Sequence, residues 1–138
     1  MSVERNREVI TRYFEDVWNA GKLEVLDELL TADYVNHNPG FSNPPLGPAG
    51  LKPIVAHMRG GLAGLHYEIL ECVVDDTAAA VYVRVKGRHV GELFGMAATG
   101  RSIDLKQMQI ERFRQGRICA HWRVTDELTM LRQLKGEL

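Results

Sequence analysis

Apolar residues in the first half of the chain recur at every third or fourth position, which is typical of helices with one buried face. The pattern predicts three such helices, at residues 3–18, 23–30 and 48–60. Asn19-Ala20-Gly21 supplies a stop after the first helix, and Pro48 suits the first position of the third. Residues 33–39 read as a short extended piece, and the Gly- and Pro-rich residues 40–47 read as a surface loop.

From Leu65 onward the period of the apolar residues falls from that of a helix to that of a strand. Four strands are expected, paired in two hairpins, at residues 66–74, 78–91, 103–113 and 117–124. Asp126 then suits the N-cap of a last helix. This order indicates an α+β fold in which one curved antiparallel sheet wraps around the N-terminal helices and a short C-terminal helix follows. We expect a single domain over residues 1–138.

Composition narrows the class of protein. With 45% hydrophobic and 25% charged residues among 138, the chain resembles an ordinary globular domain. Its net charge of −1 comes from interleaved charges without a basic face, so we expect no nucleic-acid partner. The longest apolar run is far too short to span a membrane, and the N-terminal residues do not form a signal peptide. Cys72 and Cys119 read as free thiols, so a cytoplasmic location is expected.

The residues that could carry chemistry are histidines, amides, an arginine and an aspartate. The five histidines show no metal-ligand spacing, so no metal site is expected. The motifs of serine hydrolases, P-loop nucleotidases and dinucleotide-binding proteins do not occur. Polar residues instead recur at alternate positions of the strands between residues 87 and 126. They predict a cavity that takes a small-molecule ligand without a cofactor.

Several stretches of the chain resemble one known family. They are the pair of opening helices, DYVNH at residues 33–37, GRHVGELFGM at residues 87–96, GRI at residues 116–118, and the ending HW, D and LRQL at residues 121–134. In this order and over nearly the whole chain, they resemble the SnoaL-like polyketide cyclases, which have the cone-shaped NTF2-like fold. The resemblance implies an NTF2-like α+β cone around a pocket.

The resemblance also implies a mechanism. Cyclases of this family close a ring by intramolecular aldol condensation without a metal or an organic cofactor, and an aspartate in the cone acts as general base or acid. That aspartate falls on Arg123 of this chain, and a histidine of the preceding strand falls on Gln109. Arg123 stays protonated and cannot be the base, although it could hold a carboxylate or stabilise an enolate. Gln109 forms hydrogen bonds but does not titrate.

Other residues near the expected pocket could supply the proton chemistry. The candidates for catalysis are His37, His89, His121 and Asp126. The candidates for substrate binding are Asn36, Gln107, Gln109, Arg123, Phe14 and Trp18. Structural alternatives compete with these roles: a rim or turn histidine, a histidine that holds a glycine corner, a helix N-cap, or an aromatic residue of the core.

Two functions therefore stand beside each other. The first is a cofactor-independent enzyme of the cyclase or isomerase type, and the second is a binding module that holds a small molecule without reaction. The titratable side chains near the expected pocket favour the enzyme. A further prediction concerns self-association. Met108, Ile110, Ala120 and Trp122 would form an exposed apolar patch on the outer face of the sheet, which predicts a homodimer through that face.

Overall fold

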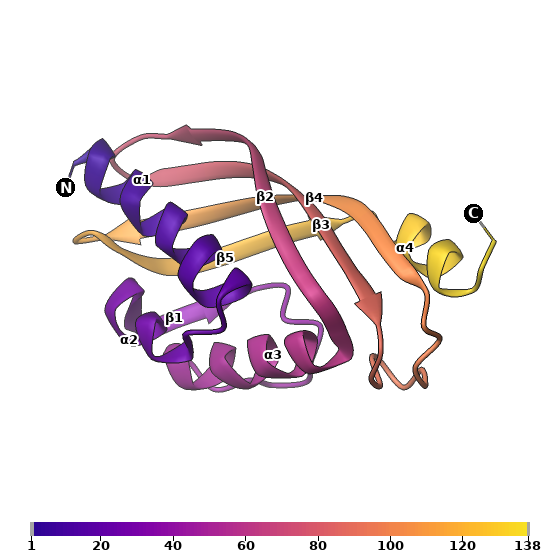
Figure 1. Ribbon diagram of the computed structural model, residues 1–138. Coiled ribbons are helices and arrows are strands. Elements are labelled where there is room, and N and C mark those ends of the chain that lie inside the picture. Colours follow the sequence, from indigo (N-terminus) through magenta and orange to yellow (C-terminus); the bar gives the residue numbers. More distant parts are fainter. Residues whose placement is uncertain (1, 138) are drawn as a thin grey trace.

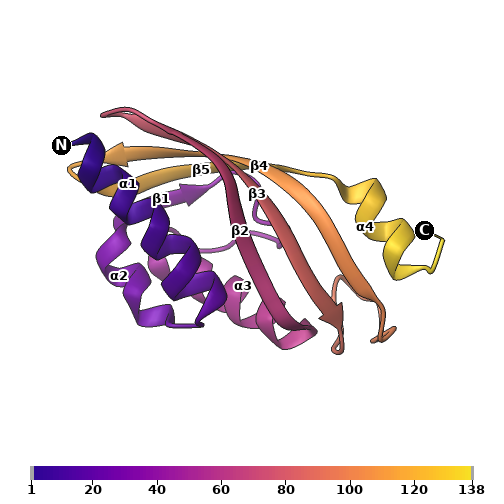
Figure 2. The ribbon, with the colours of Figure 1, turned by 45° about the horizontal axis from the view of Figure 1, so that its top comes forward.

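The computed structural model describes residues 2–137 as helices packed against one face of a curved sheet (Figure 1). The helical segments are α1 (Val3–Arg12), the π-helix η1 (Tyr13–Asn19), the 3-10 turn η2 (Leu23–Val25), α2 (Leu26–Leu29), α3 (Pro48–Gly61) and α4 (Glu127–Leu134). The strands are β1 (Leu30–Asn36), β2 (Leu62–Val74), β3 (Ala78–His89), β4 (Ser102–Arg114) and β5 (Arg117–Thr125). Figure 2 shows α1, α2 and α3 on the same side of the sheet and α4 at its far end.

The predicted fold class is confirmed, with one difference in the sheet. Strands β2 to β5 form an antiparallel meander, and the sheet order is β1-β5-β4-β3-β2. The segment predicted only as a short extended piece begins earlier, at Leu30, and pairs in parallel with β5. The sheet is therefore mixed rather than wholly antiparallel. The helical spacing of Leu30 did not reveal this, because its partner Ile118 is supplied by a strand far along the chain.

Hydrogen bonds join the end of the first helix to helix α3 and to strand β2, next to a cluster of aromatic rings. It continues as a π-helix from Tyr13 to Asn19, which turns Trp18 into the interior. The Arg59 guanidinium caps this end by donating to the carbonyls of Trp18 and Asn19, at 2.7 and 2.8 Å. The Asn19 amide bonds both the N–H and the carbonyl of Tyr67 on β2, at 2.7 and 3.0 Å. Trp18 and Tyr67 are thereby held in contact, with ring centroids 5.0 Å apart.

Helix α3 begins where the loop after β1 returns to that strand. The N–H of Gly47 donates to the carbonyl of Tyr34 at 2.8 Å, just before Pro48 starts the helix. Gly47 has a φ of 75°, and a Cβ atom there would lie 2.6 Å from the carbonyl oxygen of Ala32. Only glycine fits this approach without strain. The loop before α3 is thus held against β1, which is an edge strand of the sheet.

Candidate active site: polar rows beneath an apolar pocket

The β4–β5 hairpin carries three pairs of polar residues on the face that the helices cover. Antiparallel pairing places Gln107 opposite Thr125, Gln109 opposite Arg123, and Glu111 opposite His121. We call these pairs the polar rows. Successive rows lie about 7 Å apart, because two residues of a strand separate them. Burial increases along them, and the row of Glu111 and His121 is the deepest.

A bulge in β5 decides which side chains face inward. The pairing joins Arg112 to Ala120 and Phe113 to Ile118, so Cys119 is an extra residue in this strand. Ile118 and His121 are consequently both buried, although they are three residues apart. Simple alternation through β5 would have placed Cys119, His121 and Arg123 together on the inner face. The bulge leaves Cys119 half-buried and puts Ile118 in the core.

Glu111 and His121 form a buried dyad. Nδ1 of His121 lies 2.7 and 2.8 Å from the two carboxylate oxygens of Glu111, and the side chains are 2% and 0% exposed. Burial raises the pKa of the Glu111 carboxyl, and the nearby His121 and Arg123 offset this rise only in part. A carboxylate that holds Nδ1 fixes the orientation of the ring. Nε2 is then the nitrogen through which His121 could exchange a proton with a ligand.

The middle row, Gln109 and Arg123, is linked through an amide pair to the outermost row, Gln107 and Thr125. The Gln109 amide nitrogen donates to the Gln107 side-chain oxygen at 2.8 Å. Among the described residues, the side-chain oxygen of Gln109 and the hydroxyl of Tyr34 are buried without a hydrogen-bond partner. The indole nitrogen of Trp18 is likewise buried without a hydrogen-bond partner. Buried polar atoms are costly when unpaired, so this region is suited to receiving a polar ligand.

Arg123 brings a positive charge to the middle row. Its backbone N–H donates to the Asn38 side-chain oxygen at 2.8 Å, and Nη2 donates to the Asn38 carbonyl at 2.7 Å. The loop after β1 therefore holds this side chain in place. Among residues 2–137, no carboxylate forms an ion pair with Arg123 within 4.0 Å.

A pocket of about 330 Å³ opens over the outer two rows. This is within the size range of small-molecule sites. Its lining comes from segments along the whole chain: Trp18, Pro39, Gly40, Phe41, Ile54, Met58, Tyr67, Phe94, Gln107, Arg123, Thr125, Glu127, Met130 and Leu131. Burial raises the pKa of Tyr67 to about 12, so this lining residue stays a neutral phenol near neutral pH. The walls are largely aromatic and aliphatic, and the polar groups are concentrated on the β4–β5 hairpin.

The structure brings part of the predicted site together. Trp18, Gln107 and Arg123 line the pocket, and Gln109 and His121 belong to the polar rows beside and beneath it. Phe14 packs instead in the core, where its ring contacts Tyr13 and Tyr67 at centroid distances of 5.0 and 5.5 Å.

The remaining predicted residues have other contacts. His37 lies on the outer face, stacked on Trp122 with ring centroids 4.5 Å apart. Asp126 is the N-cap of α4, and its hydrogen bonds from the side chain and the N–H of Thr129 lower its pKa. Asn36 pairs with His121 across the strands, and its side-chain oxygen accepts from the Asn38 N–H at 2.9 Å.

His89 holds the glycine corner after β3. The ring is buried, and its Nδ1 lies 3.2 Å from the N–H and 3.1 Å from the hydroxyl of Thr99. An N–H that donates to Nδ1 leaves the ring proton on Nε2, which has no partner among the described residues. His89 is absent from the pocket lining.

The sequence analysis missed Glu111, the partner of His121. A signal for it was present, because Glu111 follows Gln107 and Gln109 at the same alternate positions of β4. The contributions of Phe41, Ile54 and Met58 had no comparable signal, since the loop and helix that carry them reach the pocket only through tertiary packing.

Residues 2–137 form neither a cluster of metal-binding side chains nor a membrane-spanning helix. No group of three or more His, Cys, Asp or Glu side chains is placed so that it could hold a metal ion. No helix in this part of the chain is both long and apolar enough to cross a membrane.

Comparisons with known proteins agree with this geometry. A model of the SnoaL-like polyketide cyclase family matches residues 8–134. Aklanonic acid methyl ester cyclase DnrD of Streptomyces peucetius is 30% identical over 127 residues, which cover 91% of this chain and 88% of the relative. Nogalonic acid methyl ester cyclase of Streptomyces nogalater is 29% identical over 119 residues, covering 85% of this chain and 88% of the relative.

Solved structures show the same fold. TsrD of Streptomyces laurentii aligns with a TM-score of 0.89 and 24% identity, covering all of this chain and 99% of that one. IdmH of Streptomyces antibioticus aligns with a TM-score of 0.79 and 28% identity, covering 94% of this chain and 98% of that one.

Proposed function

Because the chain belongs to the SnoaL-like polyketide cyclase family, we propose that it closes a ring in a polyketide-derived substrate by an intramolecular aldol reaction. Its relatives are named as cyclases of aklanonic and nogalonic acid methyl esters. The observation that carries the proposal is the set of polar rows: the outer two supply Gln107, Arg123 and Thr125 to the lining of an apolar pocket, and the Glu111–His121 dyad is the deepest row behind them. The walls suit an apolar, oxygenated substrate, and the rows suit its reacting oxygens.

In this proposal His121 moves the proton. Nε2 takes a proton from a carbon next to a substrate carbonyl, and the resulting imidazolium is stabilised by the Glu111 carboxylate at Nδ1. The enolate carbon attacks a second carbonyl carbon of the same molecule and forms the new C–C bond. The alkoxide formed there takes back the proton from Nε2. No atom is lost, so the product is an isomer of the substrate.

Arg123 and the amides assist by electrostatics. Negative charge moves from the enolate oxygen to the alkoxide during the reaction, and Arg123 is a fixed positive charge in the pocket wall. The Gln107 amide belongs to the same lining and can donate to a substrate oxygen. Because His121 supplies the base and Arg123 the positive charge, we propose that the reaction proceeds without a metal or an organic cofactor.

The second candidate is a binding module that holds a small molecule without reaction. It is favoured by the two departures at Arg123 and Gln109, because the resemblance implies titratable catalytic residues at both positions. The Glu111–His121 dyad favours the enzyme instead, because proton transfer needs an oriented titratable group and simple binding does not.

Product analysis separates the two candidates. Purified protein is incubated with aklanonic acid methyl ester, and in parallel with the corresponding free acid, and the products are separated by chromatography with mass detection. We expect a new species that has the same mass as the substrate and forms faster than in buffer alone. If neither compound is converted faster than in buffer although either one binds, the cyclase proposal fails and the binding module remains.

We also propose that the chain forms a homodimer through the outer face of the sheet. Strand pairing aligns two apolar rows there. One row consists of Val73, Ala80, Ile110 and Trp122, and the other of Tyr82, Met108 and Val124. We call these residues the outer apolar patch. Trp122 is 39% exposed and Val124 75% exposed, which is unusual for such large apolar side chains in the middle of a sheet.

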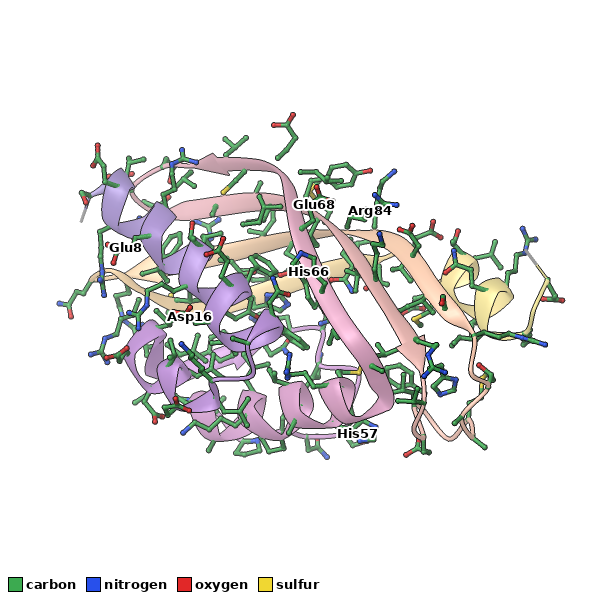
Figure 3. All side chains as sticks on the ribbon, in the orientation of Figure 1. Glu8, Asp16, His57, His66, Glu68 and Arg84 are labelled. Carbon is green, nitrogen blue, oxygen red and sulfur yellow. The ribbon has the colours of Figure 1, made fainter. Side chains whose placement is uncertain are left out.

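A charged row borders the outer apolar patch. Glu68 on β2 lies beside Arg84 on β3, as Figure 3 shows, and Arg84 is paired with Lys106 across β3 and β4. The Arg84 guanidinium also bonds both carboxylate oxygens of Asp104, at 2.8 and 2.6 Å. An apolar centre with a charged border is the usual layout of a protein–protein interface, and a second copy can cover it by twofold symmetry.

The proposed location is the cytoplasm. Cys72 and Cys119 are both unpaired and half-buried, which is compatible with a reducing compartment. Fractionation of the producing cells, followed by detection of the chain in the soluble cytoplasmic and the exported fractions, tests this location.

A further inference from the structure

Most N–H donors of the Arg123 guanidinium have no hydrogen-bond partner among the protein groups of residues 2–137. Its guanidinium carries five N–H donors in a planar fork. One of them donates to the Asn38 carbonyl, and the structure of residues 2–137 shows no other hydrogen bond from this side chain. The residue lines the pocket and is half-buried, so its charge is only partly hydrated. A guanidinium in this position is suited to an anionic ligand.

Arg84 has the carboxylate partner that Arg123 lacks among the described residues. On the outer face, the fork of Arg84 is filled by the two carboxylate oxygens of Asp104, at 2.8 and 2.6 Å. No described carboxylate stands in that position at Arg123. Glu127 is the other charged residue of the lining, but it is exposed in the first turn of α4 and forms no ion pair with Arg123 within 4.0 Å.

The surroundings of Arg123 define the rest of the ligand. Trp18, Phe41, Tyr67 and Phe94 place four aromatic rings in the walls of the same pocket. Gln107 adds a side-chain amide to the same lining. Flat apolar walls together with unused donors match a ligand that has an aromatic body and an acceptor-rich anionic end.

We propose that the substrate of this pocket is an acid with an ionised carboxylate rather than an ester, and that the Arg123 fork binds the carboxylate through two parallel hydrogen bonds. The inference rests on the proposed function for the reaction and adds the charge of the substrate. An ester has no negative charge and offers the fork weaker acceptors. Charge-assisted bonds of this kind favour the acid over its ester by about tenfold or more.

A matched pair of probes tests this inference by binding alone. The probes are anthraquinone-2-carboxylate and its methyl ester, which share the same flat aromatic body and differ in charge. Their dissociation constants are measured by calorimetry at neutral pH for the wild type and for Arg123→Gln, Arg123→Lys and Arg117→Gln. Arg117→Gln is the control, because Arg117 is an exposed residue of β5 outside the pocket and its loss changes the net charge equally.

We expect the wild type and Arg117→Gln to bind the acid about tenfold or more tightly than the ester, and Arg123→Gln to bind both equally. Arg123→Lys should keep part of the preference, because lysine retains the charge but lacks the planar fork. Circular dichroism establishes that each variant is folded. Equal binding of acid and ester by the wild type, no binding of either probe, or a preference that persists in Arg123→Gln would overturn the inference.

The binding experiment and the product analysis test separate claims, so either claim can be rejected while the other stands. A chain that cyclises aklanonic acid methyl ester but shows no preference for the acid probe keeps its proposed function and loses this inference. A chain that prefers the acid probe through Arg123 but forms no isomer keeps the carboxylate site and loses the proposed reaction.

Discussion

The two faces of the β4–β5 hairpin invert the usual distribution of side chains. The inner face, which the helices cover, has the buried polar residues Gln109, Glu111 and His121, and the outer face exposes Ile110 and Trp122. In an ordinary half-covered sheet the apolar residues point inward and the polar residues outward. The inversion occurs within single strands, at neighbouring residues, and so cannot result from a difference in local backbone structure.

Each inverted face is costly for an isolated chain, and the cost indicates what each face is for. Unpaired polar atoms in the interior lose their hydration without full compensation. Exposed apolar side chains on the outer face remain in contact with water. A polar ligand removes the first cost and a second copy of the chain removes the second. The inner face is therefore suited to chemistry and the outer face to assembly.

The largest expected effect is on the rate of ring closure. His121→Asn keeps a hydrogen-bond donor for Glu111 but removes the base, so turnover of a cyclised substrate should fall by about 10²–10⁴-fold. The matched change on the other face is His66→Asn, at an exposed residue of β2, and should leave turnover unchanged. Turnover is followed as formation of the isomeric product. Comparable losses in both variants would contradict the role of His121.

The second largest expected effect is on the free energy of unfolding, and it differs between two neighbouring residues of β4. Glu111→Ala leaves His121 without its buried partner and opens a cavity, so we expect a loss of about 3 kcal/mol in the free energy of unfolding. Arg112→Ala, at the next residue and on the exposed face, should cost less than about 0.5 kcal/mol. Urea unfolding measures both. Similar losses at the two positions would show that the faces do not differ in this way.

The third largest expected effect is on the formation of the proposed homodimer. Trp122→Arg places a charge in the centre of the outer apolar patch and should weaken the dimer by about 2 kcal/mol, or about 30-fold in dissociation constant. Val3→Arg is the control, because Val3 on α1 is 37% exposed and Trp122 is 39% exposed. Sedimentation velocity over a range of concentrations reports both. A wild-type chain that stays monomeric at micromolar concentration would reject the dimer.

The smallest effect is on the pH dependence of stability. Because the pKa of Glu111 is raised in the folded state, the folded chain retains a proton that the unfolded chain releases at pH values between the ordinary pKa and the raised one. The contribution of Glu111 to stability is therefore greatest below the ordinary glutamate pKa of 4.5 and declines as the pH rises from there through the folded value. Glu111→Gln should remove this decline. Parallel pH profiles of urea stability for wild type and variant would contradict it.

The amino-acid sequence by itself determined the local elements of this protein. The periods of its apolar residues predicted the helices and the four strands of the meander, and the resemblance predicted the family. Alternation along β4 placed Gln107 and Gln109 on one face, and the same rule would have included Glu111. These features were accessible because they depend on residues that are near one another in the chain.

The tertiary structure decided where those elements meet. Parallel pairing of β1 with β5 sets His37 against Trp122 on the outer face, far from the role that its position in the sequence suggested. The bulge at Cys119 brings His121 to Glu111, and the loop at Asn38 holds Arg123 in the pocket wall. Strand register and bulges depend on contacts between distant segments, and a shift of one residue reverses the face of every side chain. Local periodicity contains no information about that register, so the sequence identified polar residues for a site but not which of them would meet.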